Sequence, residues 1–257
     1  MVRIEHIWDK ELRCKVTTKH CSSAAREYAL MSMFNIPEII RPLALRENAI
    51  VMPHCMERSA DGIAGYCSEQ TAWKFLYDVA SGIAHIHDNG YIHHDIKPSN
   101  ILITDTGFAI GDFGACFKPG EQMLCLEEDD TSHAFSAPEW SKDKKHIVPK
   151  SDIWSLGASV FQMIMGVQIF SGRGGKAQKA CTQIPALPKD RYSTSLSSLI
   201  CSCLAFNPDE RPSAEEITKM ASQRLKASIK RERRIKSTAI LEQQCKIQDP
   251  WPEEMDA

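Results

Sequence analysis

The sequence has no glycine before Gly62, although it contains 13 glycines among 257 residues. The first sixty residues therefore cannot form a glycine-rich loop that cradles phosphate groups with backbone N–H groups. The sequence also lacks an excess of charge of one sign, because 31 lysines and arginines stand against 33 acidic residues and the formal net charge is −2. That balance gives no global attraction to nucleic acid or to an anionic membrane, and we expect neither as a partner.

The sequence also shows no long uninterrupted apolar run and no feature of a secretory leader. Residues 153–172 carry no formal charge and are long enough to test as a membrane span, but polar side chains and glycines interrupt them. We interpret this stretch as a buried helix. Residues 1–6 are charged and contain no apolar h-region, so we expect no secretory signal.

The ten cysteines include no C-x-x-C pair and no histidine at the spacing of a zinc site. Without a secretory signal, free thiols in a reducing compartment explain them better than disulfides. We therefore expect a cytoplasmic protein. The nucleus is the alternative, because the C-terminal tail is basic.

The predicted elements divide the chain into a small strand-rich part and a larger helical part. In the small part we expect a helix over 24–34 and strands over 4–8, 12–17, 36–45 and 49–52. In the large part we expect a long helix from Ser68 to Asn89-Gly90 and further helices near 151–165, 194–204 and 213–224. The fold class is therefore α+β with two lobes, residues 1–55 and 56–224, followed by a tail, residues 225–257.

The most informative segment reads YIHHDIKPSN and ends at Asn100, and a GDFG run follows it. It offers a carboxylate at Asp95, an ammonium group at Lys97 and an amide at Asn100, with a second carboxylate at Asp112. These groups can place a hydroxyl in line with a magnesium-bound triphosphate. Asn100 and Asp112 supply the hard oxygen ligands that Mg²⁺ prefers.

These residues resemble the catalytic loop and the metal-binding turn of protein kinases. Three further stretches follow in the order of that family: Ala137-Pro138-Glu139, Ser151 to Gly157, and Arg211-Pro212. The resemblance covers residues from about 11 to 222. It implies a eukaryotic-type serine/threonine protein kinase with the two-lobed kinase fold, which uses ATP and Mg²⁺ to phosphorylate protein hydroxyl groups.

By this resemblance, Asp95 is the catalytic base that orients the substrate hydroxyl. Lys97 neutralises charge on the transferring phosphoryl group, and a lysine at this position accompanies serine/threonine specificity. Asn100 and Asp112 are the metal ligands.

Three further residues have structural roles by the same resemblance. Glu139 and Arg211 form a buried ion pair that holds the end of the activation segment, residues 112–139, to the helical lobe. Asp152 accepts backbone N–H groups of the catalytic loop.

In the small lobe, the resemblance assigns the ATP-binding lysine to Lys15 and its ion-pair partner to Glu27. Lys19 and Glu38 remain alternatives for these two positions. Met52 and Cys55 are expected to line the nucleotide site where the two lobes connect.

Two features depart from the family pattern. The glycine-rich loop that normally precedes the strand lysine is absent, so either the chain is truncated or its small lobe is minimal, and a partner protein could complete that lobe. His94 stands where most regulated kinases have an arginine that pairs with a phosphate on the activation segment. We therefore do not expect activation by phosphorylation of that segment.

Three functions remain open at this point. The leading one is an active kinase, and the second is a pseudokinase or scaffold that binds partners through its helical lobe. The third, a small-molecule phosphotransferase of the aminoglycoside type, conflicts with the Ala137-Pro138-Glu139 and Ser151–Gly157 stretches. These stretches build a platform for peptides in the protein-kinase family.

The tail has its own composition. Residues 224–236 contain seven basic residues and one acid, Glu232. A solvated helical extension is the simplest interpretation, and a nuclear-localisation or nucleic-acid patch is the alternative.

Overall fold

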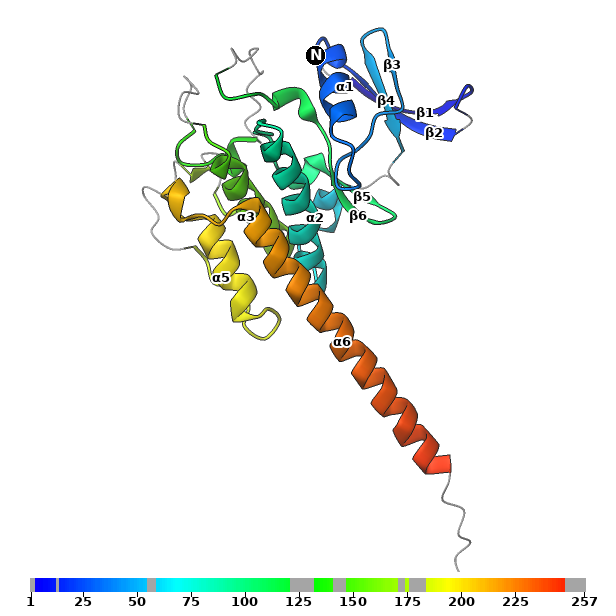
Figure 1. Cartoon of the computed structure of the whole chain (residues 1–257), viewed down its shortest axis with the longest axis vertical. Coiled ribbons are helices and arrows are strands. Elements are labelled where there is room, and N and C mark those ends of the chain that lie inside the picture. The colour runs from blue at the N-terminus through cyan, green and yellow to red at the C-terminus, as the bar shows by residue number, and fades with distance from the viewer. Residues whose placement is uncertain are drawn as a thin grey trace, which may run out of the picture.

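The computed structural model describes residues 3–12, 14–54, 59–120, 132–140, 147–170, 174–175 and 184–247. Within them the chain forms a small strand-rich lobe and a larger helical lobe (Figure 1). The predicted two-lobed α+β class is therefore confirmed. The predicted boundary between the lobes near residue 55 falls in 55–58, outside the described residues.

The small lobe is an antiparallel sheet with one helix beside it. The sheet has the strand order β1-β2-β4-β3. Its strands are β1 (Arg3–Asp9), β2 (Cys14–His20), β3 (Ala44–Arg46) and β4 (Ala49–Pro53), and the helix is α1 (Ala24–Met33). The register sets Thr17 of β2 opposite His6 and Met52. Because strand side chains alternate, Thr17, Lys19 and Met52 share one face of the sheet.

The first two predicted strands are present and pair antiparallel as a hairpin, and the carboxylate of Asp9 accepts hydrogen bonds from the residues that follow β1. Asp9 Oδ1 accepts the backbone N–H groups of Glu11 and Leu12, each at 2.9 Å. The predicted strand over 36–45 is wrong over most of its length, because only residues 44–46 pair with β4. Pro37 and Pro42 lack the N–H group that a strand ladder requires.

The large lobe consists of helices around a short hairpin. The helices are α2 (Glu69–Asp88), α3 (Lys150–Met165), α5 (Thr194–Cys203) and α6 (Ala214–Ile247), and the hairpin joins β5 (Ile101–Thr104) to β6 (Gly107–Ile110). Single 3₁₀ turns span Ala60–Ile63, Pro98–Asn100, Phe113–Ala115, Ser132–Phe135 and Pro208–Glu210.

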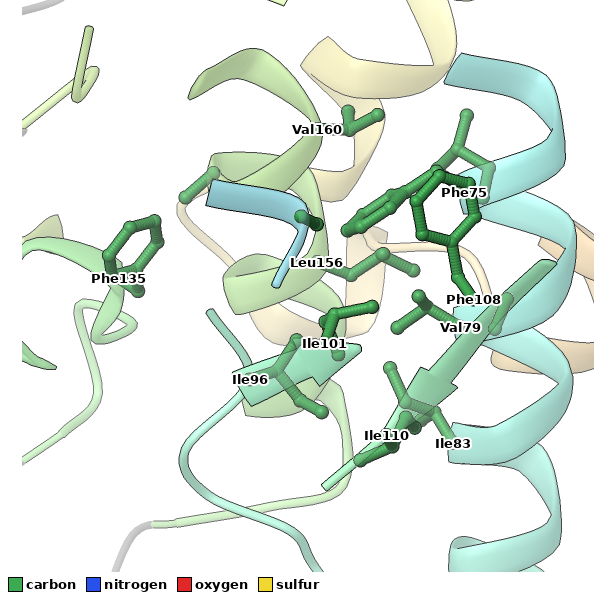
Figure 2. Close-up of a cluster of buried hydrophobic side chains, with 14 of the residues drawn as sticks. Phe75, Val79, Ile83, Ile96, Ile101, Phe108, Ile110, Phe135, Leu156 and Val160 are labelled. Atoms are coloured by element: carbon green, nitrogen blue, oxygen red, sulfur yellow. The ribbon is translucent and has the colours of Figure 1, made fainter. Parts of the chain in front are cut away.

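Helix α2 begins and ends where its sequence predicts. Ser68 caps its N-terminus, because the Ser68 hydroxyl accepts the Thr71 N–H at 3.1 Å. At the other end Gly90 adopts a positive φ of 78°, which a glycine tolerates without strain. The face of α2 that carries Phe75, Val79 and Ile83 packs on the β5–β6 hairpin and on α3 (Figure 2).

Helix α3 is buried along almost its whole length. The uncharged stretch 153–172 therefore begins as a core helix, as its interrupting polar residues indicate. Among the helices of the described part of the chain, none has both the length and the apolar character needed to cross a membrane. The cysteines at positions 14, 21, 67, 116, 201 and 203, whose side chains the structure describes, are free thiols.

One continuous apolar core joins the two lobes. It includes Met31 and Phe34 from α1 and its end, Ile50 from β4, and the inner faces of α2 and α3. The small lobe is therefore packed on the large one through α1 and its neighbours, which fixes the position of α1 relative to the catalytic loop.

Helix α6 covers the helix predicted near 213–224 and continues without a break through residues 224–236, so the helical extension interpreted there is confirmed. The helix ends at Ile247. Its first turns pack on α2, with Ile217 and Ala221 fully buried. The rest extends away from the body of the protein (Figure 1).

Candidate active site

The predicted catalytic loop, residues 91–100, is held in place by Asp152, a buried carboxylate in the first turn of α3. Its two oxygens accept the backbone N–H groups of His93 and His94 at 2.9 and 2.8 Å. His87 Nε2, from the end of α2, donates to the same carboxylate at 2.9 Å. Burial alone would raise the pKa of Asp152, but these donors outweigh it and lower the pKa. The predicted role of Asp152 is therefore confirmed.

Asp95, Lys97 and Asn100 lie together at the surface of this loop. Asp95 Oδ2 lies 3.1 Å from Lys97 Nζ and accepts the Asn100 side-chain N–H at 2.7 Å. The same amide also donates to the Asp95 backbone oxygen at 2.9 Å. The carboxylate is thus held in one orientation while a fifth of its side chain remains exposed. The sequence placed these three groups together, and the structure does the same.

A buried histidine ties this loop to the turn that carries Asp112. His93 Nε2 donates to the Gly111 carbonyl at 3.1 Å, and His93 Nδ1 accepts the Asp95 N–H at 3.3 Å. Both ring nitrogens are hydrogen-bonded, so the orientation of the imidazole is fixed. Its ring packs edge-on against Phe113 at 4.8 Å between centroids.

Lys19, and not Lys15, pairs with Glu27. Lys19 Nζ lies 2.8 Å from Glu27 Oε1 and 2.6 Å from Asp112 Oδ1. Its side chain is only 6 % exposed, whereas Lys15 is exposed. The predicted pairing of Lys15 with Glu27 is therefore wrong, and the alternative of Lys19 replaces it. Glu38, the alternative for the acid, is not the partner.

The two carboxylates keep Lys19 charged. Burial alone would lower the pKa of this lysine, but the charges of Asp112 and Glu27 outweigh burial and raise it. Burial likewise favours a higher pKa for Asp112, and Lys19 outweighs that effect and lowers it. An ammonium group between two carboxylates is thus the charge state of this site at neutral pH.

Asp112 lies in a left-handed backbone conformation, with a φ of 57°. Its Oδ1 accepts from Lys19 and from the Gly114 N–H, and the described contacts leave Oδ2 available. Asn100 uses only its amide N–H groups toward Asp95, so its carbonyl oxygen is available too. Two available hard oxygens, one from Asn100 and one from Asp112, are the ligand type that Mg²⁺ prefers.

Helix α1 is held against this turn by two further contacts. Glu27 Oε1 also accepts the Phe113 backbone N–H at 3.1 Å, and the Arg26 guanidinium donates to the Cys116 carbonyl at 2.7 Å. Arg26 was not singled out in the sequence. Its position next to Glu27 on a helix is the only sequence signal that points to it.

The ion pair predicted for the helical lobe is present. Arg211 donates from both terminal nitrogens to Glu139, at 2.6 and 2.8 Å. Arg211 is fully buried, and its remaining N–H groups reach the carbonyls of Lys150, Ala205 and Phe206. Burial would raise the pKa of Glu139, but Arg211 outweighs burial and lowers it.

Of the two residues expected at the connection between the lobes, the structure describes one. Met52 is buried on β4, on the same sheet face as Lys19. Cys55 lies outside the described residues.

His94 contacts aromatic groups. Trp140 Nε1 donates to His94 Nε2 at 3.2 Å, and the Phe117 ring lies edge-on at 5.7 Å between centroids. His94 itself has a φ of 67°, which is uncommon outside glycine. The imidazole is therefore fixed by Trp140 in the position where regulated relatives would carry the arginine.

A two-lobed fold in which this lysine, these carboxylates and this loop meet at one site defines the class of protein kinases. Residues 7–221 match the family model described as the protein kinase domain, and the chain belongs to this family.

Three relatives illustrate the similarity. A Wee1-like protein kinase of Oryza sativa subsp. japonica is 34% identical over 158 residues, which cover 59% of this chain and 28% of the relative. Serine/threonine-protein kinase pim-2 of Danio rerio is 33% identical over 157 residues, or 60% of this chain and 48% of the relative. Sperm motility kinase 2B of Mus musculus is 30% identical over 212 residues, or 77% and 42%. The matched part of this chain thus spans less than half the length of these relatives.

Proposed function

We propose that this chain is a serine/threonine protein kinase that transfers the γ-phosphate of ATP to a protein hydroxyl group. The observation that carries the proposal is Lys19 held between Glu27 and Asp112, in the same site as the Asp95 carboxylate. Burying an ammonium group and two carboxylates is energetically costly. A protein that only binds partners would gain nothing from this arrangement, whereas a kinase uses it to bind ATP.

Each charged group has a role in this reaction. Lys19 would hold the α- and β-phosphates of ATP. Asp95 would orient the substrate hydroxyl and accept its proton, and Lys97, 3.1 Å from Asp95, would offset charge on the transferring phosphoryl group. Asn100 and Asp112 would hold Mg²⁺, which neutralises charge on the β- and γ-phosphates when bound.

The specificity for serine and threonine rests on two supports. Lys97 is the residue type that accompanies this specificity in the family, and its ammonium lies beside Asp95 where a hydroxyl would enter. One relative, pim-2, is itself named a serine/threonine-protein kinase.

The second part of the proposal is that a partner protein binds at the small lobe. Such binding is also what the alternative function, a partner-binding scaffold, would require. Within the described residues, β1 pairs on one side only, with β2. Its Ile4, Ile7 and Trp8 are 59%, 44% and 63% exposed. An unpaired, apolar strand edge is a site where another extended segment can add. Such a segment would extend the small-lobe sheet beyond β1.

Replacing Asp112 with asparagine tests the metal role. Asp112→Asn removes the charged ligand and the anionic partner of Lys19, so we expect phosphotransfer from Mg-ATP to fall by at least about a thousandfold. The measurement is transfer of labelled phosphate to a generic basic protein, with Asp105→Asn, on the exposed turn between β5 and β6, as the matched control. Full activity of Asp112→Asn would remove this residue from the metal site.

A further inference from the structure

Positive charge is concentrated in one segment of this chain. Residues 224–236 carry a local excess of six positive charges, although the formal net charge of the whole chain is −2. The rest of the chain is therefore acidic. The net charge argued against a nucleic-acid partner, but an average over the chain hides a local concentration of this size.

The structure places this segment on the part of α6 that stands clear of the body (Figure 1). We call residues 226–236 the basic rod. Lys226, Lys230 and Arg231 are exposed, whereas Ile217 and Ala221, earlier on the same helix, are fully buried. The rod serves neither the core nor the catalytic site.

The helical phase spreads these charges over more than one flank of the rod. An α-helix turns by about 100° per residue, so Lys226, Lys230 and Arg233 lie within about 60° of one another around the helix axis. Arg231 lies about 100° from Lys230 around the same axis. Leu225 packs against the core on the other side. The rod thus presents cations over about 160° of its circumference, and Arg231 lies on the flank that Arg224, two turns earlier, uses to contact Ser195.

Two other kinds of binding partner fit the basic rod poorly. A coiled coil with a second copy needs apolar residues at every a and d position, and the heptad that contains Leu225 and Ile229 continues with Glu232 and Lys236. A membrane-surface helix needs a continuous apolar face, and between Lys226 and Arg231 the single large apolar residue is Ile229, 46% exposed.

We propose that the basic rod binds double-stranded DNA through its phosphate backbone, without sequence preference. A helix about 10–12 Å in diameter fits the major groove of B-form DNA, which is about 12 Å wide. Because the rod projects from the body, the protein does not collide with the groove walls. Cations on neighbouring flanks then reach phosphates on both strands. The major groove of an RNA duplex is too narrow for the same approach.

The test compares two triple variants of the full chain. The rod variant is Lys226→Gln, Lys230→Gln and Arg231→Gln, and the control is Lys15→Gln, Lys189→Gln and Lys219→Gln, which are exposed lysines elsewhere. Both lose three charges, and glutamine keeps helix propensity. Binding to a mixed-sequence DNA duplex of about 20 base pairs is measured by fluorescence anisotropy at several salt concentrations. Circular dichroism checks that α6 stays helical.

We expect the rod variant to bind about a hundredfold more weakly at 0.1 M salt, with a salt slope lower by about 2 to 3, and the control to bind like the wild type. Equal weakening in both variants would overturn the proposal, because the attraction would then not be specific to the rod. Tighter binding to phosphatidylserine vesicles than to DNA would replace DNA with a membrane surface. No binding of the wild type to the duplex at 50 mM salt would also refute it. None of these outcomes depends on kinase activity.

Discussion

Lys19→Met is expected to abolish measurable phosphotransfer, whereas Lys15→Met leaves it unchanged. The Lys19 ammonium is the only described cation in contact with both Glu27 and Asp112. Its loss removes the charge that would meet the ATP phosphates and leaves a buried glutamate without a counter-charge. A loss of about two to three orders of magnitude is typical when one such electrostatic group is removed.

The measurement is the rate of γ-phosphate transfer from Mg-ATP, together with the affinity for ATP measured by calorimetry. Lys15 provides the matched control, because it lies on the same strand and the same sheet face four residues earlier but is exposed. If Lys15→Met were the inactive variant and Lys19→Met the active one, the assignment made from the structure would be wrong.

Arg211→Met is expected to lower the free energy of unfolding by about 3–5 kcal/mol, because it leaves the Glu139 carboxylate, whose side chain is only 12% exposed, without its counter-charge. It also removes the donors to three backbone carbonyls, those of Lys150, Ala205 and Phe206. In a domain of this size the corresponding fall in melting temperature is about 10 °C. Denaturant unfolding of the purified protein measures the change directly.

The exposed Arg224 is the control for this variant, and Arg224→Met should change stability by less than about 1 kcal/mol. The pH dependence gives a second check on the ion pair. Because the pKa of Glu139 is lowered in the folded state, its stabilisation is present above the unfolded value and is lost as the pH falls through the folded value. Glu139→Gln should therefore differ most from wild type above the unfolded pKa, and the difference should shrink as the pH falls through the lowered pKa of folded Glu139. A constant difference across that range would contradict the charged pair.

The motifs of the large lobe could be predicted because their function depends on local spacing. Asp95, Lys97 and Asn100 lie within six positions, so one loop brings them together whatever surrounds it. The Glu139–Arg211 pair spans 72 positions, and only the resemblance to the family, not the local pattern, pointed to it.

The small lobe was harder to predict for a physical reason. Lys15 and Lys19 lie on the same face of β2, since strand side chains alternate with a period of two, and the alternation cannot choose between them. The choice depends on where α1 lies along the strand. That position follows from packing of Met31 and Phe34 in the shared core, which no local pattern records.

The end of α6 was harder to predict than its start, because the sequence signal changes along the helix. The apolar spacing that marks a packed helix ends near Leu225, and beyond it the segment is supported by helix propensity alone. Charge in this segment was visible in the sequence. Its projection from the body was not, because projection is a property of the packed molecule.

The most direct test of the central claim is transfer of labelled γ-phosphate from Mg-ATP to a basic protein, followed by identification of the labelled residue, with Asp95→Asn as the control. The account predicts phosphoserine or phosphothreonine with wild-type protein and no transfer with Asp95→Asn, although both proteins are folded and monodisperse. Absence of transfer by folded wild-type protein, alone and with a strand-forming partner supplied to β1, would contradict it. The partner-binding scaffold would then be the better description of this chain.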